Sequence, residues 1–203
     1  MKRKHWVLII VLLLVLGLVI LAASAFGWGK GIYNELIVQR QAAERQWADL
    51  QAQYQRRADL IPNLVETVKA NAEHERLTLE GVTEARAKAT QVKLNFNDLN
   101  QEALNEFSQK QGELSSALSR LLVASERYPE LKANRGFMDL QTQLEGTENR
   151  IATERRRYNE VVQEYNVYVR QFPNNIVAGM FDFEPMVHFA AEAGAEKAPE
   201  VKF

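Results

Sequence analysis

The sequence predicts an all-α protein, in which an N-terminal transmembrane helix is followed by an up-and-down antiparallel bundle of three to four long helices. Three features predict this fold class. Residues 6–28 contain no charged side chain and are rich in Leu, Val and Ile. Beyond them, apolar residues recur at steps of three and four, the spacing of one helix face. Glycine and proline number only 10 and 5 in 203 residues, which is typical of long helices rather than of sheets.

The composition excludes several classes of protein. The chain has 25 basic and 26 acidic residues and a net charge of −1. It therefore lacks the positive charge that attracts nucleic acid, and we expect no nucleic-acid partner. It contains no cysteine, which excludes disulfides, thiolate zinc sites and a lipid-modified cysteine. The length allows one domain and a membrane anchor.

The N-terminus predicts an uncleaved signal-anchor. Residues 6–28 form an uncharged run slightly longer than the roughly 20 residues that cross a bilayer core. Trp6 and Trp28 stand at its two ends, and aromatic side chains are typical of headgroup depth. A cleaved signal peptide is the alternative, because residues 23–25 read Ala-Ser-Ala. The apolar core of a signal peptide is usually only about 7 to 15 residues long, which favours the anchor.

The charges beside this run predict its orientation. Residues 1–5 read Met-Lys-Arg-Lys-His, whereas the basic residues on the other side are spread out. Because positive charges favour the cytoplasmic side, we expect residues 1–5 in the cytoplasm and a single pass through the cell membrane at residues 6–28. The remaining chain then faces the periplasm or the extracellular space, and the lipid bilayer is a predicted partner.

Residues 29–183 are expected to form the bundle. Lys30 lies among glycines, but no Ser or Thr follows it and no strand precedes it, so this stretch is a membrane-exit linker rather than a phosphate loop. From Ile32 to Val92 an apolar stripe predicts a helix; its members include Leu36, Ala43, Trp47, Leu50, Tyr54, Ile61, Leu64 and Val68. Pro62 lacks a backbone N–H, so this helix should bend or restart there, or the chain should reverse at residues 59–62.

Two further helices follow. Asn and Asp residues at 95–98 predict a turn, after which a helix from Leu99 to Arg127 is expected. The last helix should run from Pro129 to Phe172. Its apolar seam consists of Phe137, Leu140, Leu144, Thr147, Ile151, Glu154, Tyr158, Val161, Tyr165, Tyr168 and Phe172. Residues 184–203 have no long period and are assigned to a C-terminal tail.

The ordered motifs of the chain resemble those of the LemA family. They are Tyr33-Asn34-x-Leu36, Trp47, Arg56-Arg57-x-Asp59-Leu60-Ile61-Pro62-Asn63-Leu64-Val65, His74-Glu75, Ala85-Arg86, Tyr128-Pro129-x-Leu131-Lys132-Ala133-Asn134, Leu144-Glu145-Gly146-Thr147-Glu148-Asn149-Arg150-Ile151-Ala152, Arg157-Tyr158-Asn159, Tyr165-Asn166 and Phe172-Pro173. The resemblance covers Ile32 to about Phe183. It implies a bacterial membrane-anchored helical bundle in the inner membrane, with no established enzymatic activity. It also implies association with membrane metalloproteases or other envelope proteins. Relatives with a lipid-modified cysteine support an outward-facing domain, whereas here the transmembrane helix must be the anchor.

No catalytic, cofactor-binding or metal-binding residue is predicted. His74-Glu75 resembles the start of a zincin motif, but Thr78 stands where the second histidine would be. Arg155-Arg156-Arg157 is flanked by acidic residues and predicts a solvated face with ion pairs rather than a phosphate site. The tyrosines of the last seam predict a core rather than a binding groove.

Two charged residues lie on the apolar seams, namely Arg57 and Glu154. An unpaired ion there would be costly. We therefore expect Arg57 to pair with a carboxylate of another helix, with Glu148 and Glu154 as the candidates.

Helix lengths predict a homo-oligomer. A kinked helix from Ile32 to Val92 would leave its first half, with Trp47, uncovered by its own chain, and the end of the last helix, with Tyr165, would overhang. Exposed apolar seams favour burial against neighbouring copies, which the membrane holds close together. Reversal of the chain at Pro62 is the alternative and predicts a compact monomer.

The sequence thus predicts a non-catalytic, membrane-anchored scaffold or assembly protein of the bacterial envelope, acting through helix–helix contacts and homo-oligomerisation. The alternative is an enzyme, or a regulatory subunit of one, acting on envelope components. A cluster of buried ionisable groups in an open cleft would favour the alternative.

Overall fold

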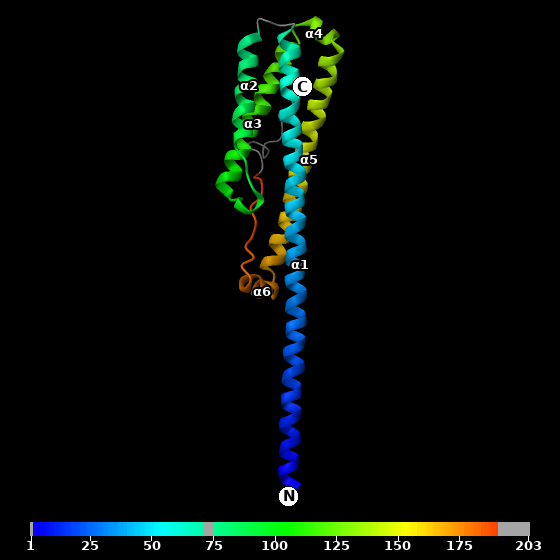
Figure 1. The fold of residues 1–203 in the computed structure, drawn as a ribbon, viewed down its shortest axis with the longest axis vertical. Helices are drawn as coiled ribbons and strands as arrows, with labels where there is room; N and C mark the ends of the chain where they lie inside the picture. Colours follow the sequence, from blue (N-terminus) through cyan, green and yellow to red (C-terminus); the bar gives the residue numbers. More distant parts are fainter. Residues whose placement is uncertain (1, 71–74, 191–203) are drawn as a thin grey trace, which may run out of the picture. The chain divides into compact units, whose positions relative to one another are not determined.

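The computed structural model describes residues 2–70 and 75–190 (Figure 1). Its helices are α1 (Lys2–Lys69), α2 (Arg76–Gln91), η2 (Phe96–Asp98), α3 (Gln101–Ser125), α4 (Pro129–Ala133), α5 (Arg135–Arg170) and α6 (Asn174–Met180). No strand occurs in these described residues, so the predicted all-α fold class is confirmed. The chain divides into two compact units. The anchor unit comprises residues 1–41 and 164–185, and the bundle unit comprises residues 42–163 and those from 186 onward.

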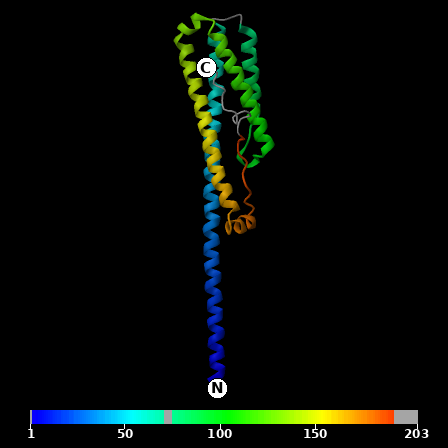
Figure 2. The ribbon, with the colours of Figure 1, turned by 180° about the vertical axis from the view of Figure 1, so that it is seen from behind.

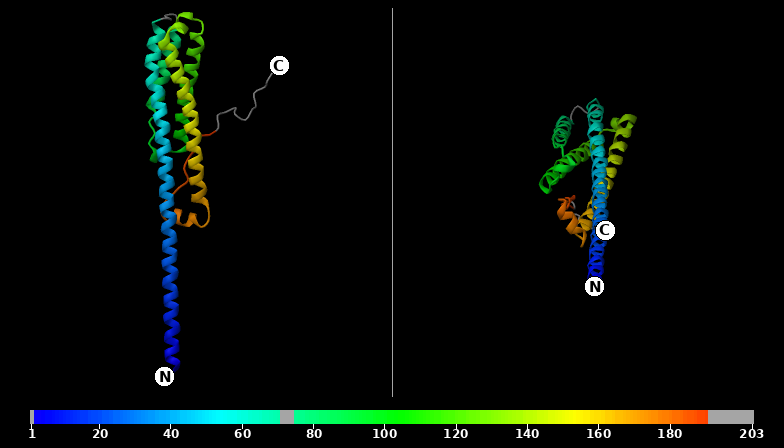
Figure 3. Two further views of the ribbon diagram at one scale, coloured as in Figure 1. Left: turned by 90° about the vertical axis from the view of Figure 1, so that its right-hand side faces the viewer. Right: turned by 60° about the horizontal axis from the view of Figure 1, so that its bottom comes forward.

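In the bundle unit, successive long helices alternate in direction. α1 leads to a reversal after Lys69, α2 returns, α3 runs back and α5 returns again, as the views agree (Figure 1, Figure 2 and Figure 3). α2 packs against α3. One core cluster holds them together and contains Ile61, Leu64, Val68, Leu79, Val82, Ala89, Leu114, Ala117, Leu118, Leu121, Leu131, Phe137 and Leu144. The up-and-down bundle is thus confirmed, and it is built from α1, α2, α3 and α5.

The chain reverses after Lys69 and not at Pro62. α1 continues through Pro62 as one helix, so the restart expected at Pro62 and the alternative of a reversal at residues 59–62 are both wrong. The helix expected from Ile32 to Val92 is also wrong, because α1 ends at Lys69 and α2 is a separate helix. Proline has no N–H to donate to the carbonyl four residues earlier, which is that of Ala58. Arg86 of α2 donates to this carbonyl instead, with its Nε 2.7 Å from the oxygen. Because a neighbouring helix replaces the lost hydrogen bond, α1 tolerates the proline.

Asparagine side chains cap two of the helices. The predicted turn at residues 95–98 forms η2, and the Asn100 side chain then accepts a hydrogen bond from the N–H of Ala103 at the start of α3. The Asn134 side chain accepts from the N–H of Phe137 in the same way. Asn134 separates α4 from α5, so the expected single last helix is interrupted near its start.

A second core cluster buries the aromatic stripe of the bundle unit. It contains Ala43, Trp47, Leu50, Tyr54, Leu104, Phe107, Ile151, Tyr158, Val162 and Phe189. Trp47 is only 2% exposed, and its ring centroid lies 6.0 Å from that of Phe107 and 5.5 Å from that of Tyr158. The expectation that the Trp47 stripe stays uncovered by its own chain is therefore wrong. Homo-oligomerisation remains a prediction, but an exposed Trp47 stripe no longer supports it.

The anchor unit has its own small core. Its buried residues are Ile32, Leu36, Tyr165, Val169, Val177, Ala178 and Phe183. Tyr165, which was expected to overhang, is thus buried as well. Residues 8–28 of α1 are exposed, and this segment is long and apolar enough to cross a membrane. One N-terminal apolar helix of this kind indicates single-pass membrane anchoring.

We predict that the arginine and the proline are energetically coupled. Arg86→Ala should lower the free energy of unfolding by about 1–3 kcal/mol, because the buried Ala58 carbonyl loses its donor. In a Pro62→Ala background the same change should cost clearly less, because the restored N–H can bond to that carbonyl. Urea unfolding of the four chains of this double-mutant cycle, followed by circular dichroism in detergent, measures the coupling.

Arg76→Ala serves as the control, because this arginine makes only an exposed ion pair within α2 and should change the stability by less than about 0.5 kcal/mol. Equal costs of Arg86→Ala in both backgrounds would show that the two residues act independently.

Candidate functional site

The most buried charge of the bundle unit is the guanidinium of Arg57, on α1. Arg57 is 1% exposed. Its Nη1 donates to Glu148 on α5 and to Ser115 on α3, each at 2.7 Å, and its Nη2 donates to the side-chain oxygen of Gln111. The predicted pairing with a carboxylate of another helix is therefore confirmed, and the partner is Glu148.

Gln111 extends this network to α2, the remaining long helix of the bundle unit. Its side-chain Nε2 donates to the Ala89 carbonyl of α2 at 3.2 Å. Arg57 and Gln111 together thus connect α1, α2, α3 and α5. The Tyr54 ring covers the guanidinium, with its centroid 5.3 Å from Cζ, and Arg57 Nε has no hydrogen-bond partner among the described residues.

A groove between α3 and α5 opens beside this network, with a volume of about 510 Å³. Small and polar side chains line it, and we call it the polar groove. The α3 side provides Asn105, Ser108, Gln109, Gly112, Ser115 and Ser116, the α5 side Glu148, Ile151, Ala152 and Arg155, and Tyr54, Arg57 and Ala190 complete it. Side chains at 105, 108, 112 and 116 recur at steps of three and four, so they form one stripe along α3.

The chain segment Met186–Phe189, which we call the C-terminal strap, packs onto the aromatic cluster. Phe189 is 3% exposed. Its backbone N–H donates to the Asn159 side-chain oxygen, and the Asn159 amide donates to its carbonyl, both at 2.9 Å. Tyr158 donates its hydroxyl to the Val187 carbonyl at 3.1 Å. The strap is therefore held by backbone hydrogen bonds, by the buried Phe189 ring, and by Met186 and Val187, which pack partly buried against the same cluster.

The ring of Phe189 lies in an aromatic pocket. Its centroid is 6.0 Å from that of Trp47 and 5.7 Å from that of Tyr158, and the Arg155 guanidinium covers it at 4.9 Å. Periodicity along the chain did not identify the strap, because only single side chains of this segment are buried. The Asn159 that binds its backbone follows the seam residue Tyr158, and the sequence marked it only as part of the family motif Arg157-Tyr158-Asn159, without a role.

The charged residues of α5 near this pocket form ion pairs, as predicted. Glu154 accepts from Arg157 at 2.9 Å and from the Gln46 side chain of α1. It is not the partner of Arg57. Arg156 is exposed, so the arginine run forms a solvated face with ion pairs rather than a converging anion site.

The zincin-like pair at His74-Glu75 is described only in part, because His74 lies outside the described residues. Glu75 is bound at the distal end of the bundle unit, where it accepts from Tyr128 Oη at 3.0 Å and from Arg127 at 3.1 Å. This hydrogen bond from Tyr128 to a carboxylate raises the pKa of that tyrosine. Within the residues that the structure describes, no three His, Cys, Asp or Glu side chains are placed to hold a metal ion.

Comparison with known proteins gives one family and several relatives. A model of the LemA family matches residues 46–203. Protein LemA of Metamycoplasma hominis is 24% identical over 161 residues, which cover 79% of this chain and 70% of that protein. Magnetosome protein MamQ 2 of Paramagnetospirillum magneticum is 32% identical over 78 residues, covering 38% of this chain. Magnetosome protein MamQ of Magnetospirillum gryphiswaldense is 30% identical over 78 residues. The match spans only 29% of the length of each magnetosome relative.

We predict that Glu148 stabilises the bundle through Arg57. Glu148→Ala should lower the free energy of unfolding by about 1–3 kcal/mol, because it leaves a buried guanidinium without its anion. Water can reach this carboxylate, which is 39% exposed, so the cost should stay below that of removing a fully buried partner. Glu145→Ala, at an exposed position of the same helix, is the matched control and should cost less than about 0.5 kcal/mol. Equal losses in urea unfolding of the two variants would refute the role of Glu148.

We also predict an alkaline loss of stability that depends on Tyr158. Burial raises the pKa of this phenol to about 12, whereas the phenol titrates near pH 10 in the unfolded chain. The unfolded chain therefore releases the proton first, and the stabilisation, complete below about pH 10, is lost as pH rises through about 12. The urea midpoint of the wild type should fall more steeply between these pH values than that of Tyr158→Phe. If the urea midpoints of the two chains fall equally with pH, groups other than Tyr158 cause the alkaline loss of stability.

Proposed function

The chain belongs to the LemA family, and on that premise we propose that it is a non-catalytic assembly protein of the bacterial envelope. In this proposal α1 anchors the protein in the inner membrane by a single pass, with its N-terminus in the cytoplasm. The bundle unit then works on the outer side of that membrane through contacts between helices. The relatives are named for the magnetosome or for the family itself.

The polar groove is the single observation that carries this proposal. A surface that accepts another helix needs small side chains, because they let two backbones approach closely, and polar atoms for hydrogen bonds across the contact. Ser108, Gly112 and Ser116 supply small side chains along one stripe of α3. Asn105 and Gln109, exposed amides that line the same groove, supply polar atoms.

Gly112 supports a partner at this stripe. A glycine inside a helix costs roughly 0.5–1 kcal/mol relative to alanine. A Cβ at Gly112 would have no heavy atom within 4 Å, so packing within the described chain does not require glycine at this position. A second backbone lying against α3 would require it.

We propose that the partner at the groove is a second copy of this chain. The membrane anchor confines copies to two dimensions and raises their effective concentration. Most dimers of identical chains have a two-fold axis, so that the same patch meets itself. The α3 stripe of one copy then lies against the α3 stripe of the other, with the two Gly112 residues close to the axis. Association with a membrane metalloprotease, which the family resemblance implies, remains a prediction.

The ionisable groups of the groove support assembly more than catalysis. They are Arg57, Glu148 and Arg155. Arg57 and Glu148 bind each other, and Arg155 lies over the Phe189 ring. An enzyme acting on envelope components, the alternative function, would need such groups to converge on an open cleft.

Cysteine cross-linking tests the two-fold contact, because the chain has no cysteine of its own. Gly112→Cys, in the full chain in native membranes, should give a disulfide-linked dimer on mild oxidation. Glu106→Cys is the matched control, since Glu106 is exposed on the same helix but lies about 120° around its axis from Gly112 and does not line the groove, and it should cross-link several-fold less.

Adding Ser116→Trp to the Gly112→Cys chain should abolish the cross-link by filling the groove. The proposed contact is wrong if both cysteines cross-link equally, or if the tryptophan has no effect.

A further inference from the structure

α6 and its flanking residues expose an unusual amount of apolar surface in the anchor unit. The exposed fractions are 76% for Phe172, 52% for Ile176, 72% for Met180 and 54% for Phe181. No charged residue occurs in positions 171–181. Exposed apolar patches of this kind mark surfaces that contact a partner or a membrane.

α6 also has a buried side, and the residues that follow it lie against α1. Val177 and Ala178 are buried, and the ring of Phe181 lies 4.8 Å from that of Tyr33 on α1. The ring of Phe183 lies 5.6 Å from Tyr33. The exposed side chains therefore occupy a defined position along α1, close to Tyr33.

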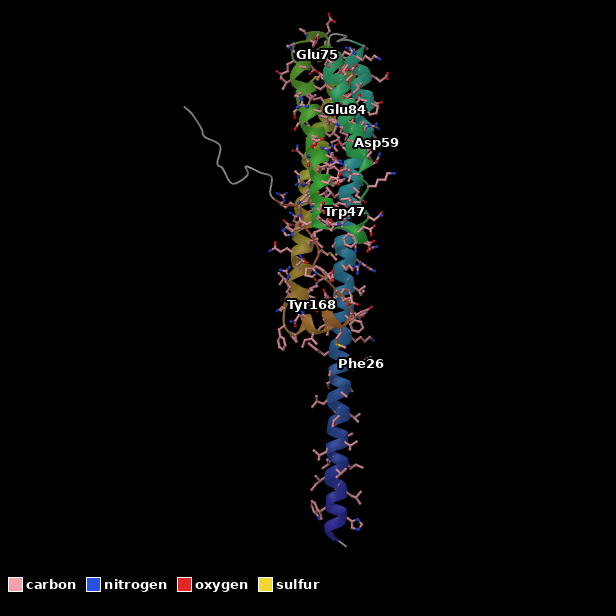
Figure 4. All side chains as sticks on the ribbon, turned by 90° about the vertical axis from the view of Figure 1, so that its left-hand side faces the viewer. Phe26, Trp47, Asp59, Glu75, Glu84 and Tyr168 are labelled. Atoms are coloured by element: carbon pink, nitrogen blue, oxygen red, sulfur yellow. The ribbon has the colours of Figure 1, made fainter. Side chains whose placement is uncertain are left out.

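That position coincides with the expected surface of the bilayer. Residues 6–28 rise about 34 Å as an α-helix, slightly more than the roughly 30 Å of the hydrocarbon core. Tyr33 follows Trp28 by about 7.5 Å, which corresponds to the headgroup layer. The first buried residue of α1 is Ile32. Figure 4 shows Phe26, within the apolar segment, just beyond the turn that contains α6.

We propose that α6 and its flanks bind the lipid surface from which α1 emerges. Phe172, Ile176 and Met180 insert at the boundary between headgroups and acyl chains, as the apolar face of an interfacial helix does. The proposal rests on α1 spanning a bilayer. A single spanning helix is free to rotate about its axis and to tilt, whereas a second contact beside it restricts both motions. The α6 contact thus gives the anchor unit a fixed orientation on the membrane.

Spin labels on single introduced cysteines test this proposal in the full chain. We would reconstitute it in vesicles of phosphatidylethanolamine and phosphatidylglycerol, and measure collisions of each label with oxygen and with a water-soluble nickel chelate. Met180→Cys and Ile176→Cys probe α6. Leu14→Cys probes the spanning segment. Val38→Cys is the matched control, because Val38 is an exposed apolar residue of the same unit, about 7.5 Å beyond Tyr33 along α1.

Labels at residues 14, 176 and 180 should collide mainly with oxygen, which dissolves in lipid. The label at residue 38 should collide with the nickel chelate several-fold more often than they do. If the labels at residues 176 and 180 collide with the nickel chelate as often as the label at 38, while the label at 14 stays in lipid, then the α6 contact is wrong although the membrane anchor stands. If 14 is itself accessible to nickel, α1 does not span and both ideas fail. Spin–spin broadening at 180 would show that a second copy covers α6, which also overturns the proposal.

Discussion

The buried guanidinium of Arg57 is the constraint on which the packing of the bundle unit depends. Removing such a group from water is costly unless all of its surroundings are arranged to bind it. Glu148, Ser115 and Gln111 meet this need from two other helices, and Gln111 extends it to α2. An apolar seam alone tolerates a slip of one helix past another, because neighbouring turns offer similar side chains. The Arg57 network does not, since a slip would leave an ion buried without partners.

The sequence predicted those parts of the fold that follow from local chemistry. The apolar seams, the membrane-length segment and the need of Arg57 for a carboxylate all depend on spacing or on the cost of burying a charge. The reversal of the chain was not predictable in this way. Pro62 has the properties of a helix breaker, and its tolerance depends on Arg86, which lies 28 positions beyond Ala58 in the chain. Only a structure shows that such a distant side chain reaches the Ala58 carbonyl.

The candidate site was harder to predict than the fold. The polar groove is lined by serines and a glycine, which carry no signal when apolar periodicity is the criterion. The C-terminal strap has one deeply buried side chain, Phe189, and two partly buried ones, Met186 and Val187, and its backbone is hydrogen-bonded to Asn159 and Tyr158. Backbone recognition leaves no pattern in the recognised segment. Because part of the strap is bound through its backbone, residues 186–190 show no apolar periodicity although they complete a core cluster.

The position of the strap has a consequence for protein synthesis. Met186–Phe189 follows every helix of the described chain, yet Phe189 forms one wall of the pocket around Trp47. A ribosome makes α1 first and the strap only after all of these helices. The growing chain therefore cannot complete the pocket around Trp47 until the strap has been made. Closure of the pocket by Phe189 therefore requires that every helix of the described residues has already been translated.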